Sequence, residues 1–247
     1  MLKVLRNIWS IVNRAQFEPS IVGPFVNPFY LARKGLFDAI KAKKDRLSGI
    51  VLDIGCGSTP YKQLFPYDMY IGVEVGPYKK SSCVNVYFDG ETLPFKADAF
   101  DSVLSTQVFE HIFSPDRYLS ELHRILKNDG VVLMSVPFVW DEHEQPRDFA
   151  RYSSFGLKHL LSCHGFKILD HTKTLADATI IFQLINAYLF KVLHAKGILT
   201  ILFYTMFIMA PFSLLGSLLG RILPKNPDLY LDNVVLFCKT NAEVKRV

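Results

Sequence analysis

The chain has 247 residues, of which half are hydrophobic, and it carries a formal net charge of +5 at pH 7. This length suits one large domain, or one domain with an elaboration. The charge does not indicate a nucleic-acid partner, and it suits an anionic membrane surface or substrate only weakly. The four cysteines are scattered, with the spacing of neither a zinc site nor a disulfide framework, which is typical of a reducing cytoplasm.

The first 47 residues predict a helical arm at the N-terminus. Apolar side chains repeat there at helical spacing, at Leu5, Ile8, Trp9 and Val12. Arg6 and Arg14 interrupt the apolar run, so the segment is a poor signal peptide. The apolar face suits packing on the domain or contact with a membrane. Residues 31–47 predict a further helix, with a solvated side made of Lys41, Lys43, Lys44 and Arg46.

Strands and helices alternate from residue 48 to residue 172, which predicts an α/β domain. Short apolar runs predict strands within 49–57, 69–75, 82–89, 100–107, 130–138 and 166–172. Helical patterns follow the fourth and fifth strands, at 116–126 and 155–165. Strands that alternate with helices form a mostly parallel sheet, and strands that are apolar throughout indicate helices on both of its faces.

Two glycines directly follow the first predicted strand, in the sequence VLDIGCGSTP. Gly55 and Gly57 predict a tight turn there that lets the backbone approach a ligand closely. Glu74 ends the second strand, where a carboxylate accepts hydrogen bonds from ribose hydroxyls. A nicotinamide site would favour a third glycine at position 60, but Pro60 is there. Asp53, just before the glycines, suits a ligand that carries an ammonium group.

The run Asp53-Ile-Gly55-Cys-Gly57 resembles motif I of the class I S-adenosylmethionine-dependent methyltransferases. Further matches follow in that family's order, and the resemblance covers roughly residues 48–172. It implies that Glu74 binds the ribose, that Asp89 receives the adenine amino group, and that Gln107 lies near the methyl group. The implied cofactor is S-adenosylmethionine, and its implied binding residues are Asp53, Gly55, Gly57, Glu74, Asp89 and Gln107.

The same resemblance implies a Rossmann-like sheet of seven strands, in which the antiparallel last strand lies between the fifth and the sixth. Residues 229–240 are the candidate for that strand. The methyltransferase domain then comprises 48–172 and 229–240, and residues 173–228 form an apolar helical insertion. The run GSTPYKQLFP resembles a branch that modifies glycans or lipids, although Thr59 stands where many members have glycine.

The resemblance thus implies methyl transfer, by in-line displacement, to a small-molecule, glycan or lipid-linked acceptor. A protein that binds the cofactor without turnover and docks a membrane complex is the alternative. An oligomer is compatible with either function, and neither requires nucleic acid.

A polar loop at 140–154 follows the fifth predicted strand, at the rim where open α/β sheets bind their ligands. We predict substrate contacts from Arg147, Asp148 and Arg151, with an ordinary solvated loop as the alternative. His143 is the first candidate for a catalytic base and His111 the second, because imidazole titrates near neutral pH. The HEXXH spacing is absent and methyl transfer itself requires no metal, so we predict no metal site.

Residues 198–219 are uncharged and long enough to cross a bilayer as a helix, with Pro211 as a point where the helix can break or kink. A single crossing would separate the last strand from its sheet. Three arrangements stay open: a membrane hairpin with both ends on one side, a buried helical pair or oligomer contact, and a true span. Basic residues at both ends favour a hairpin whose ends are cytoplasmic. We therefore expect a cytoplasmic protein that is peripheral or monotopic at the membrane.

Overall fold

The computed structural model describes residues 15–76, 82–193 and 197–240. The apolar face predicted from Leu5 to Val12 lies outside these described residues. The described chain divides into two compact units. The sheet unit comprises 40–138, 142–172 and 232–240, and the helical unit comprises 15–39, 139–141 and 173–231. Residues 15–39 of the N-terminal arm and the apolar insertion, which are distant in sequence, therefore belong to one helical unit.

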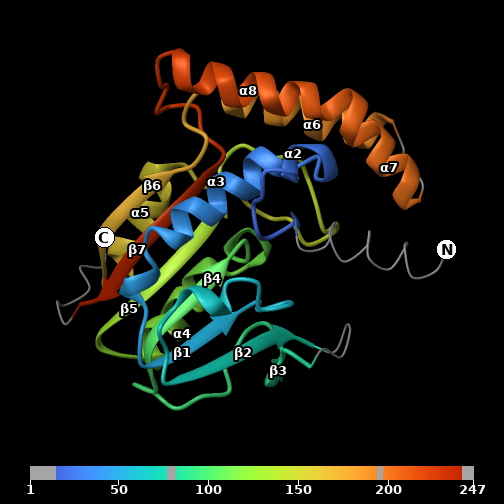
Figure 1. Cartoon of the computed structure of the whole chain (residues 1–247). Coiled ribbons are helices and arrows are strands. Elements are labelled where there is room, and N and C mark those ends of the chain that lie inside the picture. The colour runs from blue at the N-terminus through green and yellow to red at the C-terminus, as the bar shows by residue number, and fades with distance from the viewer. Residues whose placement is uncertain (1–14, 77–81, 194–196, 241–247) are drawn as a thin grey trace. The chain divides into compact units, whose positions relative to one another are not determined.

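The sheet unit is built on seven strands in the order β3-β2-β1-β4-β5-β7-β6 (Figure 1). Their bounds are β1 Ile50–Ile54, β2 Met69–Val75, β3 Val86–Phe88, β4 Phe100–Thr106, β5 Leu126–Pro137, β6 Phe166–Lys173 and β7 Asp232–Lys239. The pairs β1–β2, β1–β4, β2–β3 and β4–β5 are parallel. Strand β7 lies between β5 and β6 and runs antiparallel to β5. The predicted Rossmann-like fold class is confirmed.

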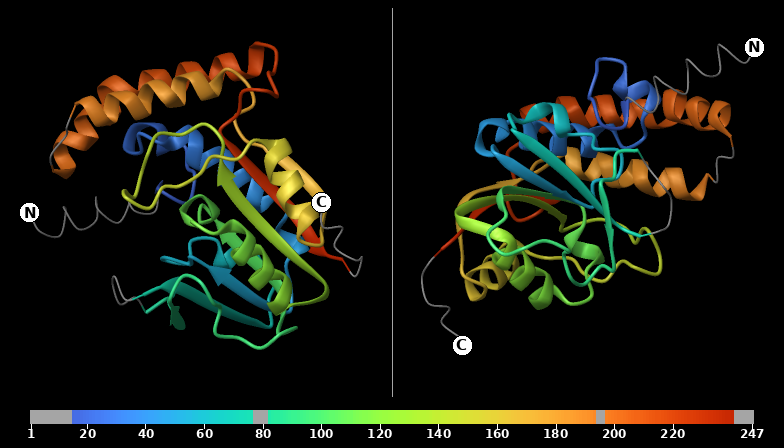
Figure 2. Two further views of the ribbon diagram at one scale, coloured as in Figure 1. Left: turned by 180° about the vertical axis from the view of Figure 1, so that it is seen from behind. Right: turned by 90° about the horizontal axis from the view of Figure 1, so that it is seen from below.

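Two helices pack on one face of this sheet, α4 Pro115–Ile125 and α5 Ser154–Cys163 (Figure 2). Helix α4 buries a stripe at helical spacing, made of Tyr118, Leu119, Leu122 and Ile125. Helix α5 contributes Leu157 and Leu161 to the same core, which also contains residues of β1, β4, β5 and β7. A single apolar core thus joins the central strands, and it supports the loops at their ends.

The helix predicted at residues 31–47, within the N-terminal arm, differs from its prediction. Helix α3 ends at Lys41 (Tyr30–Lys41), and a short 3₁₀ turn follows at Lys44–Arg46. Lys43 is buried rather than solvated, because its ammonium group pairs with Asp170 at 2.7 Å and donates to Thr172 Oγ1 at 2.7 Å. Helical spacing alone does not reveal this long-range pair with β6.

The predicted insertion contains two long helical segments. Helix α6 spans Thr179–Val192, and α7 Ile198–Tyr204, the π-turn η4 Thr205–Met209 and α8 Ala210–Ile222 follow each other directly. They form one helix over Ile198–Ile222 that is long and apolar enough to cross a membrane, although only 22 % of its most apolar window is buried. Pro211 does not end it, because the proline lies in the first turn of α8, just after the π-turn.

Helices α6 and α8 lie side by side in antiparallel directions (Figure 1). Asn186 Nδ2 donates to Ser213 Oγ at 2.9 Å, and a Cβ added to Gly216 would lie 2.7 Å from Phe182 Cβ. A Cβ added to Gly220 would lie 2.6 Å from Thr179 Cγ2. The hairpin is therefore made by α6 and the long helix together, and not within residues 198–219. Its start and its end lie next to each other.

The close approach of the two helices at Gly216 gives a test of the hairpin. We expect Gly216→Leu to lower the free energy of unfolding by about 1–3 kcal/mol, because an added side chain forces Phe182 away. Thermal unfolding followed by circular dichroism measures the change. The control is Leu215→Ala, since Leu215 is 45 % exposed on the same helix. Equal stability of Gly216→Leu and the unchanged protein would contradict this packing.

Candidate functional site

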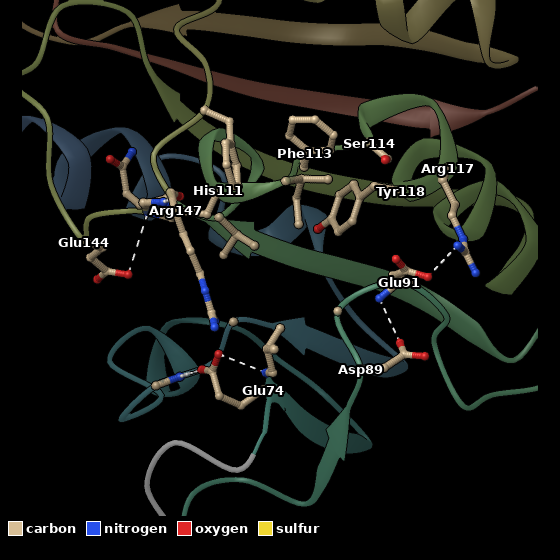
Figure 3. A pocket seen from close by; sticks show the side chains of 18 residues that line it. Glu74, Asp89, Glu91, His111, Phe113, Ser114, Arg117, Tyr118, Glu144 and Arg147 are labelled. Atoms are coloured by element: carbon tan, nitrogen blue, oxygen red, sulfur yellow. Dashed lines mark hydrogen bonds and ion pairs between the residues drawn. The ribbon is translucent and has the colours of Figure 1, made fainter.

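A cavity of about 580 Å³ lies at the carboxyl ends of β1, β2 and β4 in the sheet unit (Figure 3). Open α/β sheets bind their ligands at this edge. Its walls include five of the predicted cofactor residues, which are Gly55, Gly57, Glu74, Asp89 and Gln107. Two residues predicted for acceptor chemistry, His111 and Arg147, also line it. Residues that are up to 94 positions apart in sequence, from Gly55 to Phe149, thus meet in one cavity.

The turn after β1 is the floor of the cavity. Gly55 and Gly57 have φ values of +66° and +48°, which disfavour a side chain. A Cβ on Gly55 would lie 2.4 Å from Val108 Cγ2, whereas nothing lies within 4 Å of a Cβ on Gly57. Gly55 therefore allows the β1 and β4 loops to approach each other, and Gly57 leaves space for a ligand.

The carboxylate of Glu74, near the end of β2, is held by two backbone hydrogen bonds. Its Oε2 accepts a hydrogen bond from the Gly57 backbone N–H at 3.1 Å, and its Oε1 accepts from the Val75 N–H at 3.2 Å. These two bonds orient the carboxylate, and each oxygen keeps a further lone pair for a ligand hydroxyl. Figure 3 shows the Arg147 side chain extending from the opposite loop toward the side of the cavity that contains Glu74.

Asp89 follows β3 and shapes the next turn. Its Oδ1 accepts hydrogen bonds from the backbone N–H groups of Glu91 and Thr92, both at 2.8 Å. These bonds lower the pKa of Asp89, with a smaller contribution from the positive charge of Arg117. Arg117 also closes this end of the cavity, where its guanidinium pairs with Glu91 at 2.6 Å (Figure 3).

Asp53 lies beneath the cavity rather than on its wall. Its side chain is buried, and Tyr70 donates a hydrogen bond to its Oδ2 at 2.5 Å. Burial raises the pKa of Asp53 to about 7; the bond from Tyr70 opposes this effect, and the charge of Glu74 adds to it. A direct contact with an ammonium group stays a prediction, but a cation nearby would stabilise this carboxylate.

Gln107 connects the cavity to two further strands. It follows β4 with a φ of +55°, and its N–H donates to the Ser135 carbonyl of β5 at 2.9 Å. Its side-chain Nε2 donates to Ser135 Oγ at 3.2 Å and to Asp232 Oδ1, at the start of β7, at 3.3 Å. Gln107, a predicted cofactor residue, is thus held by both β5 and β7.

The loop after β5 is held against the 3₁₀ turn Phe109–His111 that follows β4. The backbone N–H groups of Phe149 and Ala150 both donate to the Glu110 carbonyl, at 2.9 and 3.2 Å. His111 Nδ1 lies 2.7 Å from the Arg147 carbonyl. Two segments that were predicted separately as the methyl-proximal turn and the substrate loop therefore form one wall.

Asp148 and Arg151 are placed behind this wall rather than in the cavity. Arg151 pairs with both oxygens of Asp148, at 2.5 and 2.6 Å, and its hydrogen bonds hold the pKa of Asp148 down at about 2. Asp148 Oδ2 in turn lies 3.2 Å from His143 Nδ1. Their predicted contact with substrate is untested, and the contacts present orient His143.

Glu110 is the residue that sequence reasoning missed. Glu110 belongs to the sequence QVFEH at residues 107–111, and nothing in that sequence distinguishes it from an exposed acidic residue at the start of a helix. Its side chain is fully buried, and burial raises its pKa to about 8. It lies beside His111 and His143, the two predicted base candidates.

Residues 52–134 match the family model of a methyltransferase domain. The chain carries a class I S-adenosylmethionine-dependent methyltransferase domain. An uncharacterised methyltransferase of Mycobacterium leprae is 34% identical over 97 residues, which are 35% of this chain and 36% of that protein. An uncharacterised protein of Methanocaldococcus jannaschii is 26% identical over 140 residues, which are 50% of this chain and 67% of the relative. A tRNA (carboxymethyluridine(34)-5-O)-methyltransferase of Arabidopsis thaliana is 28% identical over 35% of this chain and 24% of its own length.

Solved structures share the fold of this methyltransferase domain. The [4+2]-cyclase SpnF has a TM-score of 0.56 at 18% identity, covering 86% of this chain and 83% of its own. Phosphoethanolamine N-methyltransferase 2 of Haemonchus contortus, solved with S-adenosylhomocysteine, has a TM-score of 0.53 at 18% identity, covering 89% of this chain and 56% of its own. These likenesses support the fold of the methyltransferase domain and leave its acceptor open.

The buried Asp53 predicts a pH dependence of stability. Its pKa is about 7 in the folded chain and near 3.8 when exposed, so between these values the folded state binds more protons. The free energy of unfolding therefore falls as the pH rises from about 4 to about 7, by up to ~1.4 kcal/mol per pH unit from this group. We expect Asp53→Asn to flatten the dependence, as measured by urea unfolding at each pH.

Asp89→Asn is the control for this measurement. The pKa of Asp89 is lowered, so its contribution changes only below about pH 4. A dependence that is equally steep in Asp53→Asn and in the unchanged protein would contradict the assignment.

Proposed function

We propose that the protein transfers a methyl group from S-adenosylmethionine to a small-molecule, glycan or lipid-linked acceptor. The observation that carries the proposal is the meeting of Gly57, Glu74 and Asp89 in one cavity at the carboxyl edge of the sheet. Open space above Gly57 fits a ligand that must approach the backbone. Two oriented carboxylates fit a ligand with hydroxyl and amino donors.

The residues of the methyltransferase domain divide the cavity into two sides. On one side Glu74 would accept bonds from ribose hydroxyls and Asp89 from the adenine amino group. On the other side, His111, Glu144 and Arg147 form the wall for the acceptor (Figure 3). S-adenosylmethionine, when bound, supplies a methyl group activated by a sulfonium, so the chain's main task is to hold the acceptor in line.

The proposed acceptor wall carries the positive charge of Arg147 and the imidazole ring of His111. Arg147 suits an anionic group on the acceptor, such as a phosphate or carboxylate. His111 suits the removal of a proton where the acceptor is a hydroxyl. His143 contacts the same cluster from behind, and its role as a base would pass through His111 or Glu110.

A second candidate function is cofactor binding without methyl transfer. The similar fold of a [4+2]-cyclase supports keeping it, because a shared fold does not imply a shared reaction. A tRNA acceptor is a further alternative, because the relative from Arabidopsis thaliana is named as a tRNA methyltransferase. A methyl-release assay with a lipid extract, a glycan mixture and total tRNA as acceptors separates these possibilities.

We further propose that the helical unit attaches the protein to the cytoplasmic face of a membrane. The long helix exposes a set of large apolar side chains, each 44–66 % exposed: Leu199, Phe203, Met206, Phe207, Leu214, Leu215, Leu218 and Ile222. Soluble surfaces rarely carry so large a continuous apolar set. A lipid-linked acceptor would be reached at such a surface.

Calorimetry tests the cofactor assignment. We expect the unchanged protein to bind S-adenosylmethionine and Glu74→Gln to bind it about 10- to 150-fold more weakly, which corresponds to ~1.5–3 kcal/mol for hydrogen bonds to a charged group. Glu91→Gln is the matched control, because Glu91 lines the same cavity but pairs with Arg117. Absence of binding by the folded, unchanged protein would overturn the assignment.

Vesicle flotation tests the membrane proposal. We expect the double variant Phe203→Ser with Phe207→Ser to bind phosphatidylglycerol–phosphatidylcholine vesicles at least about tenfold more weakly, because each phenylalanine contributes ~1.5–3 kcal/mol on full burial. Phe155→Ser is the control, since Phe155 is 82 % exposed on α5 of the sheet unit. Flotation that is the same for the double variant, the control and the unchanged protein would refute the helix as the attachment.

A further inference from the structure

Three side chains with metal-binding atoms converge at the edge of the cavity. Glu110 and His111 come from the turn after β4, and His143 comes from the loop after β5. The Nε2 atoms of His111 and His143 each lie 3.9 Å from Glu110 Oε1. One ligand atom from each of the three residues lies within 4.8 Å of the others.

Glu110 lacks the partners that a buried carboxyl needs. Its side chain is fully buried, and neither carboxyl oxygen has a hydrogen-bond partner among the residues that the structure describes. An unpaired buried carboxylate is costly. A cation between the three residues would remove this cost, since a metal ion supplies both a positive charge and a bonding partner.

Both histidines are already oriented as metal ligands are. His111 Nδ1 lies 2.7 Å from the Arg147 carbonyl, and His143 Nδ1 lies 3.2 Å from Asp148 Oδ2. The hydrogen bond from His111 Nδ1 to this carbonyl leaves its Nε2 as the electron-pair donor. His143 Nδ1 lies between the Asp148 carboxylate and Arg151 Nη2, which is 3.5 Å away, and the Nε2 atoms of both histidines face Glu110. Metal-bound histidines almost always bond a carbonyl or a carboxylate in this way through the other ring nitrogen.

We propose that Glu110, His111 and His143 bind a divalent transition-metal ion through two imidazole nitrogens and one carboxylate oxygen. This donor set suits Zn²⁺, Co²⁺ or Fe²⁺ better than Mg²⁺, which prefers oxygen ligands. Ligand bonds of about 2.0–2.2 Å place neighbouring ligand atoms about 3.3 Å apart in a tetrahedral site. The 3.9 Å separations need only a small movement of side chains to reach that value.

The site would leave positions open toward the cavity. His111 and Glu144 line the cavity, and Glu144 Oε2 lies 3.9 Å from His111 Nε2 on this more exposed side. A ligand from the cavity could therefore approach the ion next to the proposed acceptor wall. Three protein ligands with open positions are typical of catalytic rather than structural metal sites.

The role of the ion rests on the proposed methyl transfer. With both ring nitrogens of His111 engaged, the ion would replace His111 as the group that activates the acceptor, because a hydroxyl bound to the ion would lose its proton to solvent more readily. Its oxygen would then form the new bond to the methyl carbon, while the carbon–sulfur bond breaks and its electron pair stays on sulfur. The inference therefore assigns a hydroxyl-bearing acceptor and O-methylation to this chain.

Cobalt binding tests the site without any assay of activity. We expect the EDTA-stripped protein to bind one Co²⁺ at the cluster, with visible d–d absorption, and Zn²⁺ to displace it. Glu110→Gln and His143→Asn should each lose the absorption band or weaken binding by at least about 100-fold. Asp148→Asn, which removes the negative charge beside His143 Nδ1 and weakens the pair with Arg151, should weaken it by about 10- to 100-fold.

His164→Asn is the control and should bind Co²⁺ like the unchanged protein, because His164 pairs with Asp116 on α4. Circular dichroism verifies that each variant is folded. No Co²⁺ band in the unchanged protein, or an equal band in Glu110→Gln and His143→Asn, overturns the metal site. Calorimetry with S-adenosylmethionine on the same samples separates the two proposals, since a failed metal site leaves cofactor binding intact and a failed cofactor site leaves the Co²⁺ band intact.

Discussion

The antiparallel pairing of β7 with β5 is the interaction on which the rest of the structure depends. It runs from Val131 and Cys238 to Pro137 and Asp232, so β7 is inserted between β5 and the edge strand β6. The first residues of β7 also reach the site. Asp232 Oδ1 accepts from Gln107 Nε2, and Asn233 Nδ2 donates to the Tyr152 carbonyl at 2.8 Å. Strand β7 therefore holds both the turn after β4 and the segment after β5.

Two buried carboxyls give this edge of the sheet an electrostatic character that the overall charge of +5 does not reveal. Asp53 and Glu110 are both almost without solvent contact, and burial raises the pKa of Asp53 to about 7 and that of Glu110 to about 8. Such groups cost stability in the empty protein. Each would gain from a nearby positive charge, Asp53 beneath the turn after β1 and Glu110 beside His111 and His143. A site that costs stability when empty favours binding of the cations that relieve it.

The sheet, and the meeting of the glycines and carboxylates in one cavity, could be predicted from sequence because they depend on local patterns. Gly55 and Gly57 follow a buried strand, and Glu74 and Asp89 each end a segment, so chain order alone places them at one edge. The acceptor side could not be predicted in the same way. Glu110, His111 and His143 meet only because the loops after β4 and β5 pack together, and the separation of 32 positions between His111 and His143 follows no spacing rule. The burial of Lys43 could not be predicted for the same reason, since its partner Asp170 lies on β6, which is distant in sequence.

The return of the chain to the sheet also limits how the apolar hairpin can meet a membrane. Residues near Thr179 and Gly220 lie next to each other, so the hairpin begins and ends at one place. Asn186 is buried inside it, where its Nδ2 donates to the Met209 carbonyl and to Ser213 Oγ. These polar contacts hold the two helices to each other and leave the large apolar side chains on the outside. Because β6 precedes the hairpin and β7 follows it in the same sheet, any entry into a bilayer must be from the side on which the sheet lies.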